Sequence, residues 1–422
     1  MGGESIKLQS CDESLESLIL SQSSPGIAVA ENRWPCASDS MLEVHKSQGL
    51  ANGIHNLLAF DLWKDQNLVD RIQKQSELLH QSTAEELEDV RDEINRYRPG
   101  SGVHKVGGVS HADFDIPEVI TLLVVGPEGA GKSSLINNMI RVLKDVTSGF
   151  SRAQIYGYRQ SGSMFLQEYL LHKHFCVFDS RGFSNINVLE DLNIVKNWMS
   201  NGVCHGEPVC RPSDDMKIRE DLEGRGRQGN SGYTLRKVNF VIFVVNACKL
   251  QQMREQHDVA ALENLVLLYR CPYLTFMDDV PVVVMTHGDK LDPHECILAR
   301  IFLGKLFGVS PVDQVFDIPC FTERTVHPED VHAANDLALL KMLQLSLEQA
   351  DTNLPCKEKF TYSIRGVLKS TSVQLGIWQL LYFVILFCLL FEIIITIIHS
   401  SKPTPWFRNI FKYAHKKPKR GH

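Results

Sequence analysis

The segment at residues 126–133 carries the residue types of a phosphate-binding loop. It reads GPEGAGKS and matches the pattern G-x-x-x-x-G-K-[ST] in full. Its glycines let the backbone wrap closely around phosphate oxygens and present N–H groups as a concave anion site. We expect Lys132 to reach the β- and γ-phosphates and Ser133 to offer its hydroxyl to Mg²⁺. The residues predicted to bind the nucleotide here are Gly126, Pro127, Glu128, Gly129, Ala130, Gly131, Lys132, Ser133 and Ser134.

The position of this loop between an apolar run and a helical pattern strengthens the interpretation. Val119–Val125 predicts a buried strand, and Lys132–Leu143 predicts a helix that starts within the loop. The positive end of that helix's dipole would add to the attraction for phosphate. A strand, a loop and a helix in this order are the context that the pattern requires.

A second polar turn follows the apolar segment HFCVF. Asp179 ends that segment and is predicted to hold Mg²⁺ through water, while the N–H of Gly182 is predicted to face a γ-phosphate. Arg181 lies between them and is a candidate for stabilising charge on that phosphate; an ordinary surface arginine is the alternative. The pattern D-x-x-G is weak alone, but here it stands at the end of a predicted core strand.

A third polar turn ends the segment VVVMTHGDKL, residues 282–291. The carboxylate of Asp289 suits guanine, because it can accept hydrogen bonds from both N1–H and the 2-amino group, and adenine offers neither. A carboxylate left unpaired against adenine is costly, which gives discrimination. We expect Thr286 to support Asp289, and the imidazole of His287 to offer a flat face to the base or ribose. A plain turn at the end of a strand is the alternative interpretation.

The rest of residues 113–355 predicts an α/β domain in three layers, with a mostly parallel sheet covered by helices on both faces. The expected strands are Val119–Val125, Phe175–Phe178, Val238–Asn246, Pro281–Thr286 and Gln314–Phe321. The expected helices are Lys132–Leu143, Val188–Met199, Arg254–Tyr269, His294–Phe307 and Ala333–Ala350. Residues 202–237 are rich in glycine and charge and predict an insertion loop.

Residues 1–112 form a polar N-terminal region, partly helical, that ends in a glycine-rich linker. Leu87, Val90 and Ile94 fit one stripe of a helix, which is either a solvated helix or one that binds a partner. The net charge of −6 gives no support for nucleic-acid binding. Eleven scattered cysteines indicate reduced thiols and a chain that faces the cytosol.

The C-terminal part predicts a membrane anchor. Leu375–Ile398 is almost wholly apolar, and at about 1.5 Å per residue its roughly 36 Å would cross a bilayer core of about 30 Å. A buried helix that is apolar on all sides is the alternative. We therefore expect a juxtamembrane linker at 356–373, a transmembrane helix at 374–399 and a basic tail at 400–422. A single span so near the C-terminus predicts a tail-anchored protein, in the endoplasmic reticulum or the outer membrane of a plastid or mitochondrion.

The three polar motifs together resemble those of GTPases. Gly126–Ser133, Asp179–Gly182 and Thr286–Asp289 stand in the order and rough spacing of the G1, G3 and G4 motifs. With the C-terminal anchor, the chain resembles the group that includes septins, chloroplast outer-envelope import receptors and avrRpt2-induced GTPases. It more closely resembles plant P-loop proteins with GPEGAGKSSLIN, DSRGF and THGDKL motifs. The resemblance implies a Mg²⁺–GTP site, a membrane-attached G domain and dimerisation across the nucleotide face.

Two departures from that pattern bear on catalysis. No switch I threonine is identifiable, and Ser161 and Ser163 are the candidates for its role. Phe183 follows Gly182 where related enzymes place a glutamine that orients water, so we expect slow hydrolysis unless a GTPase-activating partner supplies a group. The sequence thus predicts a membrane-anchored, cytosol-facing GTP switch. The alternatives are a membrane scaffold that binds nucleotide without turnover, and an enzyme that uses ATP.

Overall fold

The structure is a computed structural model that describes residues 48–81, 84–103, 111–143, 163–184, 187–229, 234–276, 279–319 and 329–357. The chain divides into two compact units, Met1–Leu50 and Ala51–His422. Helix α1 (Gln48–Ala59) begins in the first unit, and the sheet with all the other helices belongs to the second.

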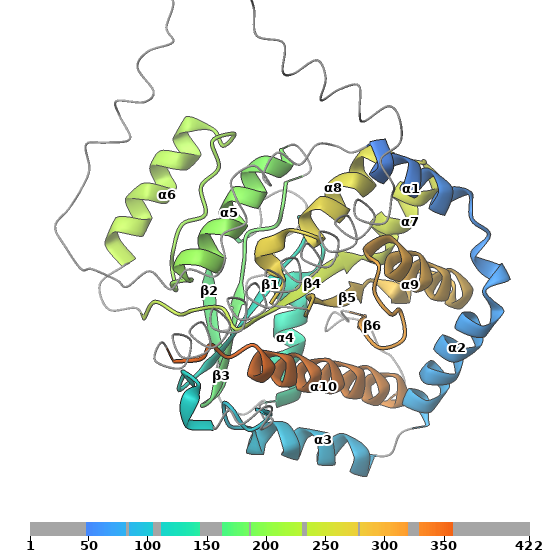
Figure 1. The fold of residues 1–422 in the computed structure, drawn as a ribbon, viewed down its shortest axis with the longest axis horizontal. Coiled ribbons are helices and arrows are strands. Elements are labelled where there is room, and N and C mark those ends of the chain that lie inside the picture. Colours follow the sequence, from blue (N-terminus) through green and yellow to red (C-terminus); the bar gives the residue numbers. More distant parts are fainter. Residues whose placement is uncertain are drawn as a thin grey trace, which may run out of the picture. The chain divides into compact units, whose positions relative to one another are not determined.

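A six-stranded sheet forms the centre of the second unit, in the order β2-β3-β1-β4-β5-β6 (Figure 1). All neighbouring strands are parallel except β2, which pairs with β3 antiparallel at the edge. The strands are β1 (Ile120–Val125), β2 (Gln167–His172), β3 (Phe175–Asp179), β4 (Phe240–Asn246), β5 (Val282–Thr286) and β6 (Val315–Asp317). The predicted α/β class and mostly parallel sheet are confirmed.

Helices cover both faces of this sheet. The α-helices that follow α1 are α2 (Gln66–His80), α3 (Ala84–Arg96), α4 (Lys132–Leu143), α5 (Val188–Asn201), α6 (Met216–Gly229), α7 (Ala247–Glu255), α8 (Val259–Tyr269), α9 (Pro293–Phe307) and α10 (Glu329–Thr352). Side chains alternate between the faces of a strand. In β4, Ile242 and Val244 therefore face a cluster with α4 and α10, whereas Phe243 contacts Tyr269 of α8 and Phe307 of α9.

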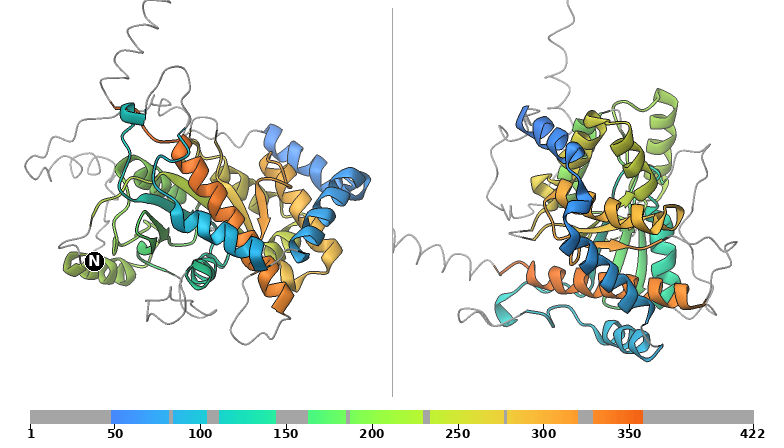
Figure 2. Two further views of the ribbon diagram at one scale, coloured as in Figure 1. Left: turned by 90° about the horizontal axis from the view of Figure 1, so that it is seen from below. Right: turned by 90° about the vertical axis from the view of Figure 1, so that its right-hand side faces the viewer.

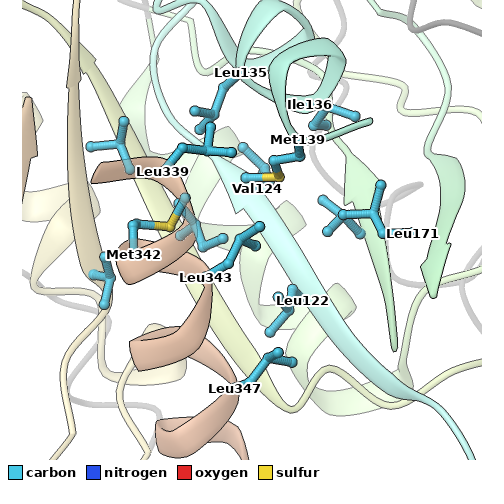
Figure 3. Packing of buried hydrophobic residues seen from close by; sticks show 14 of the residues in the cluster. Leu122, Val124, Leu135, Ile136, Met139, Leu171, Leu339, Met342, Leu343 and Leu347 are labelled. Carbon is cyan, nitrogen blue, oxygen red and sulfur yellow. The ribbon is translucent and has the colours of Figure 1, made fainter. Parts of the chain in front are cut away.

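The layer of α4 and α10 contains the densest apolar packing. Figure 3 shows Leu135 and Met139 of α4 and Leu339 and Leu343 of α10 meeting over β1. All four side chains are fully buried. Removing one of them would cost about 2–5 kcal/mol of stability. This packing fixes β1 and α4, and with them the loop that joins them at the site.

The helices at 66–96 pack onto the domain, although the sequence assigns them to a separate N-terminal region. Helix α3 lies beside α10, as both views of Figure 2 show. Ile94 is buried there, and Leu87 and Val90 pack at the edge of the same cluster. The partner of the predicted apolar stripe is therefore the chain's own last described helix, and the compact unit starts well before residue 112.

Two other expectations about the domain organisation have different outcomes. The predicted insertion loop at 202–237 contains helix α6, so it is partly ordered as a helix. Within the described ranges, no helix is long and apolar enough to cross a membrane. The predicted linker, transmembrane helix and tail beyond residue 357 lie outside those ranges.

Candidate nucleotide-binding site

The phosphate loop joins β1 to α4, between residues 126 and 131. Three of its glycines have positive φ, namely Gly126 at 149°, Gly129 at 72° and Gly131 at 90°. Other residues rarely adopt these angles. At Gly126 a Cβ atom would lie 2.2 Å from the carbonyl oxygen of Val244, so only glycine fits. The sequence pattern thus reflects a backbone that curls tightly beside the end of β4.

Lys132 begins α4 and turns its side chain back over the loop. The side chain is buried, and Nζ donates to the carbonyl oxygens of Gly126 at 3.2 Å and Pro127 at 3.3 Å. Burial lowers the pKa of Lys132 to about 8, and the nearby charge of Asp179 partly opposes that shift. An ammonium group held in this way can exchange carbonyl oxygens for phosphate oxygens.

Asp179 ends β3 and gathers two hydroxyl groups. Ser133 Oγ donates to its Oδ2 at 2.6 Å, and Ser163 Oγ donates to the same atom at 2.9 Å. The other oxygen, Oδ1, is buried without a hydrogen-bond partner among the residues that the structure describes. Burial raises the pKa of Asp179, against the opposing charge of Lys132.

This oxygen cluster fits Mg²⁺. One carboxylate and two hydroxyls are hard oxygen donors, and Mg²⁺ is usually held by one or two carboxylates together with phosphates and waters. The partnerless Oδ1 of Asp179 is the atom that a cation would satisfy. In the described part of the chain no group of three or more His, Cys, Asp or Glu residues is placed to hold a metal, so an all-protein cage is not seen there.

The structure brings Ser163, one of the two serines predicted as candidates for the switch I role, beside Ser133 and Asp179. Its hydroxyl lies 3.4 Å from that of Ser133, on the same carboxylate oxygen. The sequence offers Ser161 and Ser163 equally, because nothing in the surrounding residues distinguishes them. Ser161 lies outside the described residues. The fold places Ser163, just before β2, in the oxygen cluster around Asp179.

The D-x-x-G turn lies directly against the phosphate loop. A Cβ atom on Gly182 would be 2.6 Å from Cα of Glu128 and 3.0 Å from Nζ of Lys132. The next residue, Phe183, pairs with the loop: its N–H donates to Gly126 O and its carbonyl accepts from Glu128 N–H, each at 3.0 Å. The ring of Phe183 is buried against Phe243. It therefore cannot orient water as a polar side chain would.

Arg181 does not face the phosphate loop, contrary to expectation. Its guanidinium group makes two hydrogen bonds of 2.6 Å to the carboxylate of Asp214, and a third to the carbonyl oxygen of Val209 at 2.7 Å. Both partners of the ion pair are largely buried. Because these hydrogen bonds occupy its donors, the guanidinium group of Arg181 stabilises the D-x-x-G turn and does not reach a phosphate.

Arg211 is the residue that sequence reasoning missed. It comes from the insertion and donates to the carbonyl oxygen of Gly182 at 2.5 Å, and to Asp191 at 2.7 and 2.9 Å. Its charge is close enough to oppose protonation of Lys132. No motif marks it, because the insertion has no recognisable pattern and the contact exists only in the folded chain.

We predict that Arg211→Ala strongly destabilises the fold. Asp191 is fully buried and would keep an unpaired charge, which costs about 3–5 kcal/mol. Urea denaturation followed by circular dichroism measures the loss. Arg96→Ala is the control, because the Arg96–Asp92 pair is exposed and should contribute less than about 1 kcal/mol. Equal losses in the two variants would contradict this account of Arg211.

The T-H-G-D segment lies on the other side of the phosphate loop. Thr286 is buried at the end of β5 and donates to the carbonyl oxygen of Ala130 at 2.7 Å. His287 Nδ1 lies 2.9 Å from Thr286 Oγ1. Thr286 Oγ1 also lies 3.3 Å from the carbonyl oxygen of Val245. When its single proton is donated to either carbonyl, the contact with His287 takes an Nδ1–H donor.

Asp289 is exposed in a short 3-10 helix, Gly288–Lys290. His287 precedes that helix with φ at 61°, a left-handed angle that is uncommon outside glycine. A Cβ atom on Gly131 would lie 3.3 Å from Cε1 of His287, so the imidazole sits against the phosphate loop. Burial lowers the pKa of His287, and the ring is therefore neutral at physiological pH. An accessible carboxylate thus follows a flat neutral ring beside the phosphate site.

Comparison with known proteins gives only distant matches. No protein-family model and no curated protein matches the chain. A solved structure of a probable GTP-binding protein EngB shares 15% identity over 47% of this chain and 89% of that chain, with a TM-score of 0.27. Toc33 from Arabidopsis thaliana in complex with GDP and Mg²⁺ shares 13% identity over 57% and 89%, with a TM-score of 0.29.

The septin GTPase domain from Chlamydomonas reinhardtii is a third match. It shares 17% identity over 44% of this chain and 59% of that chain, with a TM-score of 0.22. These values are low, and the function proposed below is supported by the residues of the site itself.

Proposed function

We propose that the chain binds a guanine nucleotide together with Mg²⁺. The observation that carries this proposal is the position of the T-H-G-D segment. Thr286 bonds it directly to the phosphate loop, and it leaves the Asp289 carboxylate exposed. A base held there would meet a bidentate acceptor, which guanine can satisfy and adenine cannot.

The other site residues have matching roles. Ser133, Asp179 and Ser163 would hold Mg²⁺, which when bound would neutralise charge on the β- and γ-phosphoryl oxygens. Lys132 would donate to those oxygens, and the N–H groups of the phosphate loop would orient them. The N–H of Gly182 is proposed to face the γ-phosphate; the space beside this glycine is within reach of Lys132, since an added Cβ atom would lie 3.0 Å from its Nζ. The D-x-x-G turn would then contact the γ-phosphate of GTP and lose that contact with GDP, as in a switch.

Hydrolysis of GTP to GDP and phosphate is proposed to be slow, or stimulated by a partner. Phe183 is buried and Arg181 is committed to Asp214. Neither can therefore position water or stabilise charge at the γ-phosphate. These observations also favour the second candidate, a scaffold that binds nucleotide without turnover. Phosphate release by the wild type, compared with Lys132→Ala, separates the two: equal rates would indicate the scaffold.

Nucleotide binding itself is tested by Lys132→Ala. Full-length protein in detergent would be titrated with fluorescent GTP, with and without Mg²⁺. We expect Mg²⁺ to tighten binding to the wild type, and Lys132→Ala to weaken binding at least tenfold, because a charge-assisted hydrogen bond is lost. Wild-type affinity in the variant, with the fold intact by circular dichroism, would show that the nucleotide binds elsewhere.

Binding should also depend on pH through Lys132. Its pKa of about 8 in the empty site is below that of a free lysine. We therefore expect nucleotide affinity to fall as pH rises through about 8, by up to tenfold per pH unit. The same linkage makes the empty protein more stable as pH rises from about 8 toward 10.5, since the unfolded chain then binds more protons. Nucleotide titrations below the pH at which guanine N1–H ionises, and denaturation across the whole range, measure the two effects. Both are repeated with Lys132→Ala, in which the contribution of Lys132 should be absent.

We further propose that residues 374–399 anchor the protein in a membrane, with the nucleotide site facing the cytosol. The support is the length and apolar character of that segment. A fluorescent fusion should sediment with membranes and resist extraction by alkaline carbonate. Deleting residues 374–422 should release it, and a full-length fusion that stays in the supernatant would refute the anchor.

A further inference from the structure

Three consecutive carbonyl groups of the phosphate loop each accept a hydrogen bond from a side chain. Lys249 Nζ donates to Glu128 O at 2.7 Å, and Asn246 Nδ2 donates to Gly129 O at 3.2 Å. Thr286 donates to Ala130 O at 2.7 Å, as described above. Thr286 belongs to a recognised segment, but Asn246 and Lys249 do not. They stand where β4 passes into α7, at the centre of the sheet.

These bonds determine where the loop's N–H groups point. In a planar trans peptide, the C=O of one residue and the N–H of the next point in opposite directions. Holding the carbonyl of Glu128 toward Lys249 therefore turns the N–H of Gly129 the other way, to the concave side where phosphate would lie. A loop held in this orientation need not reorganise on binding, which preserves affinity.

Lys249 is placed for this role by its surroundings. Its side chain is half-buried, and a Cβ atom on Gly129 would lie 2.8 Å from its ammonium nitrogen. Its charge reaches both ends of the site, because it opposes protonation of Lys132 and of His287. Lys249 therefore adds positive charge to the loop as well as a hydrogen bond.

Asn246 has both ends of its side chain fixed. Its Oδ1 caps α7 by accepting from the N–H of Lys249 at 3.2 Å, which leaves Nδ2 directed at the carbonyl of Gly129. The same turn contacts the base segment, where Cys248 Sγ donates to the carbonyl oxygen of His287 at 3.5 Å. The Asn246–Lys249 turn thus contacts both the phosphate loop and the T-H-G-D segment.

We propose that Asn246 and Lys249 are positioning residues for the nucleotide polyphosphate. They hold the phosphate loop from behind, so that its N–H groups face the β- and γ-phosphates, and Lys249 adds positive charge near the loop. The inference rests on the proposed nucleotide binding. It adds the Asn246–Lys249 turn to the phosphate loop, the D-x-x-G turn and the T-H-G-D segment as a fourth part of the site. It predicts a contribution to phosphate recognition and none to the choice of base.

Lys249→Met tests this proposal through a series of ligands. Affinities of the full-length protein for GTP, GDP and GMP would be measured by competition with fluorescent GDP. We expect GTP and GDP to bind about tenfold to a hundredfold more weakly and GMP to bind as before, because only the former place a β-phosphate in the loop. Asn246→Ala should show a smaller loss of the same kind, and Lys249→Arg should retain most of the affinity.

Lys173→Met is the matched control. It removes an exposed lysine from the turn between β2 and β3, at the opposite end of the parallel strands, and should change none of the affinities. An equal loss for GMP and GDP in Lys249→Met would overturn the proposal and indicate a general structural role. No loss for any of the nucleotides would also overturn it, because Lys249 would then not contribute to binding. The wild type alone tests the proposed function: if it does not prefer guanine, the same series is measured with ATP, ADP and AMP.

Discussion

Asp289→Asn is expected to abolish the preference for GTP over ATP. The carboxylate is the only group of the T-H-G-D segment that offers two acceptor oxygens to a base edge. An amide keeps one acceptor and presents N–H donors to the 2-amino group of guanine, so one hydrogen bond is lost and two donors oppose each other. We expect GTP affinity to fall about a hundredfold, in line with the loss of a charged hydrogen-bond pair. ATP affinity should not fall and should rise if the unpaired carboxylate disfavours adenine.

The same substitution should create a new preference. Xanthine carries a carbonyl oxygen at the position of guanine's amino group, and this oxygen can accept from the new amide. Competition with fluorescent GDP measures the affinities for GTP, ATP and XTP in one assay. His287→Ala is the comparison, since it removes a ring face and the bond to Thr286 and should cost only a few-fold. A larger loss of selectivity in His287→Ala than in Asp289→Asn would mean that the base is read differently.

Asp179→Asn is expected to stabilise the empty protein while it removes the response to Mg²⁺. Burial raises the pKa of Asp179 above its unfolded value, so its ionisation opposes folding. This destabilisation is absent at acidic pH and appears as pH rises through the folded pKa. The free energy of unfolding at neutral pH should therefore be higher in Asp179→Asn, and the difference should shrink at mildly acidic pH.

The response to Mg²⁺ should move in the opposite direction. Without the carboxylate, Ser133 and Ser163 offer only neutral oxygens, and we expect Mg²⁺ to tighten nucleotide binding at least tenfold less than in the wild type. Denaturation at several pH values and nucleotide titration with and without Mg²⁺ measure the two effects. A variant that is less stable when empty would contradict the expected cost of ionising Asp179. A variant that responds fully to Mg²⁺ would contradict the placement of the metal at Asp179.

Apolar patterning predicts the centre of the sheet well. The run at β4 is buried at every residue but the last, and such a run has few alternatives in an α/β domain. The sequence does not predict β2, because Gln167–His172 mixes polar and apolar residues and is buried at only one position. That strand is stabilised by antiparallel pairing at the edge of the sheet, a tertiary contact that leaves little trace in local composition.

The site divides in the same way. Residues that shape the backbone of the phosphate loop follow a local pattern, and Gly126 shows the steric reason. Residues that act from a distance do not: Arg211 comes from an insertion, and Lys249 follows a strand without any motif. The local sequence of Arg181 could not separate a phosphate role from that of a surface arginine, because its partner Asp214 lies in that insertion.

A direct comparison of GTP and ATP tests the central claim that this site binds a guanine nucleotide. Full-length protein in detergent, loaded with fluorescent GDP and Mg²⁺, would be challenged with unlabelled GTP and with unlabelled ATP. The arrangement of Thr286, His287 and Asp289 predicts displacement by GTP at concentrations at least a hundredfold lower than by ATP. Displacement by both at the same concentration would contradict the claim and leave a phosphate site with no preference for the base.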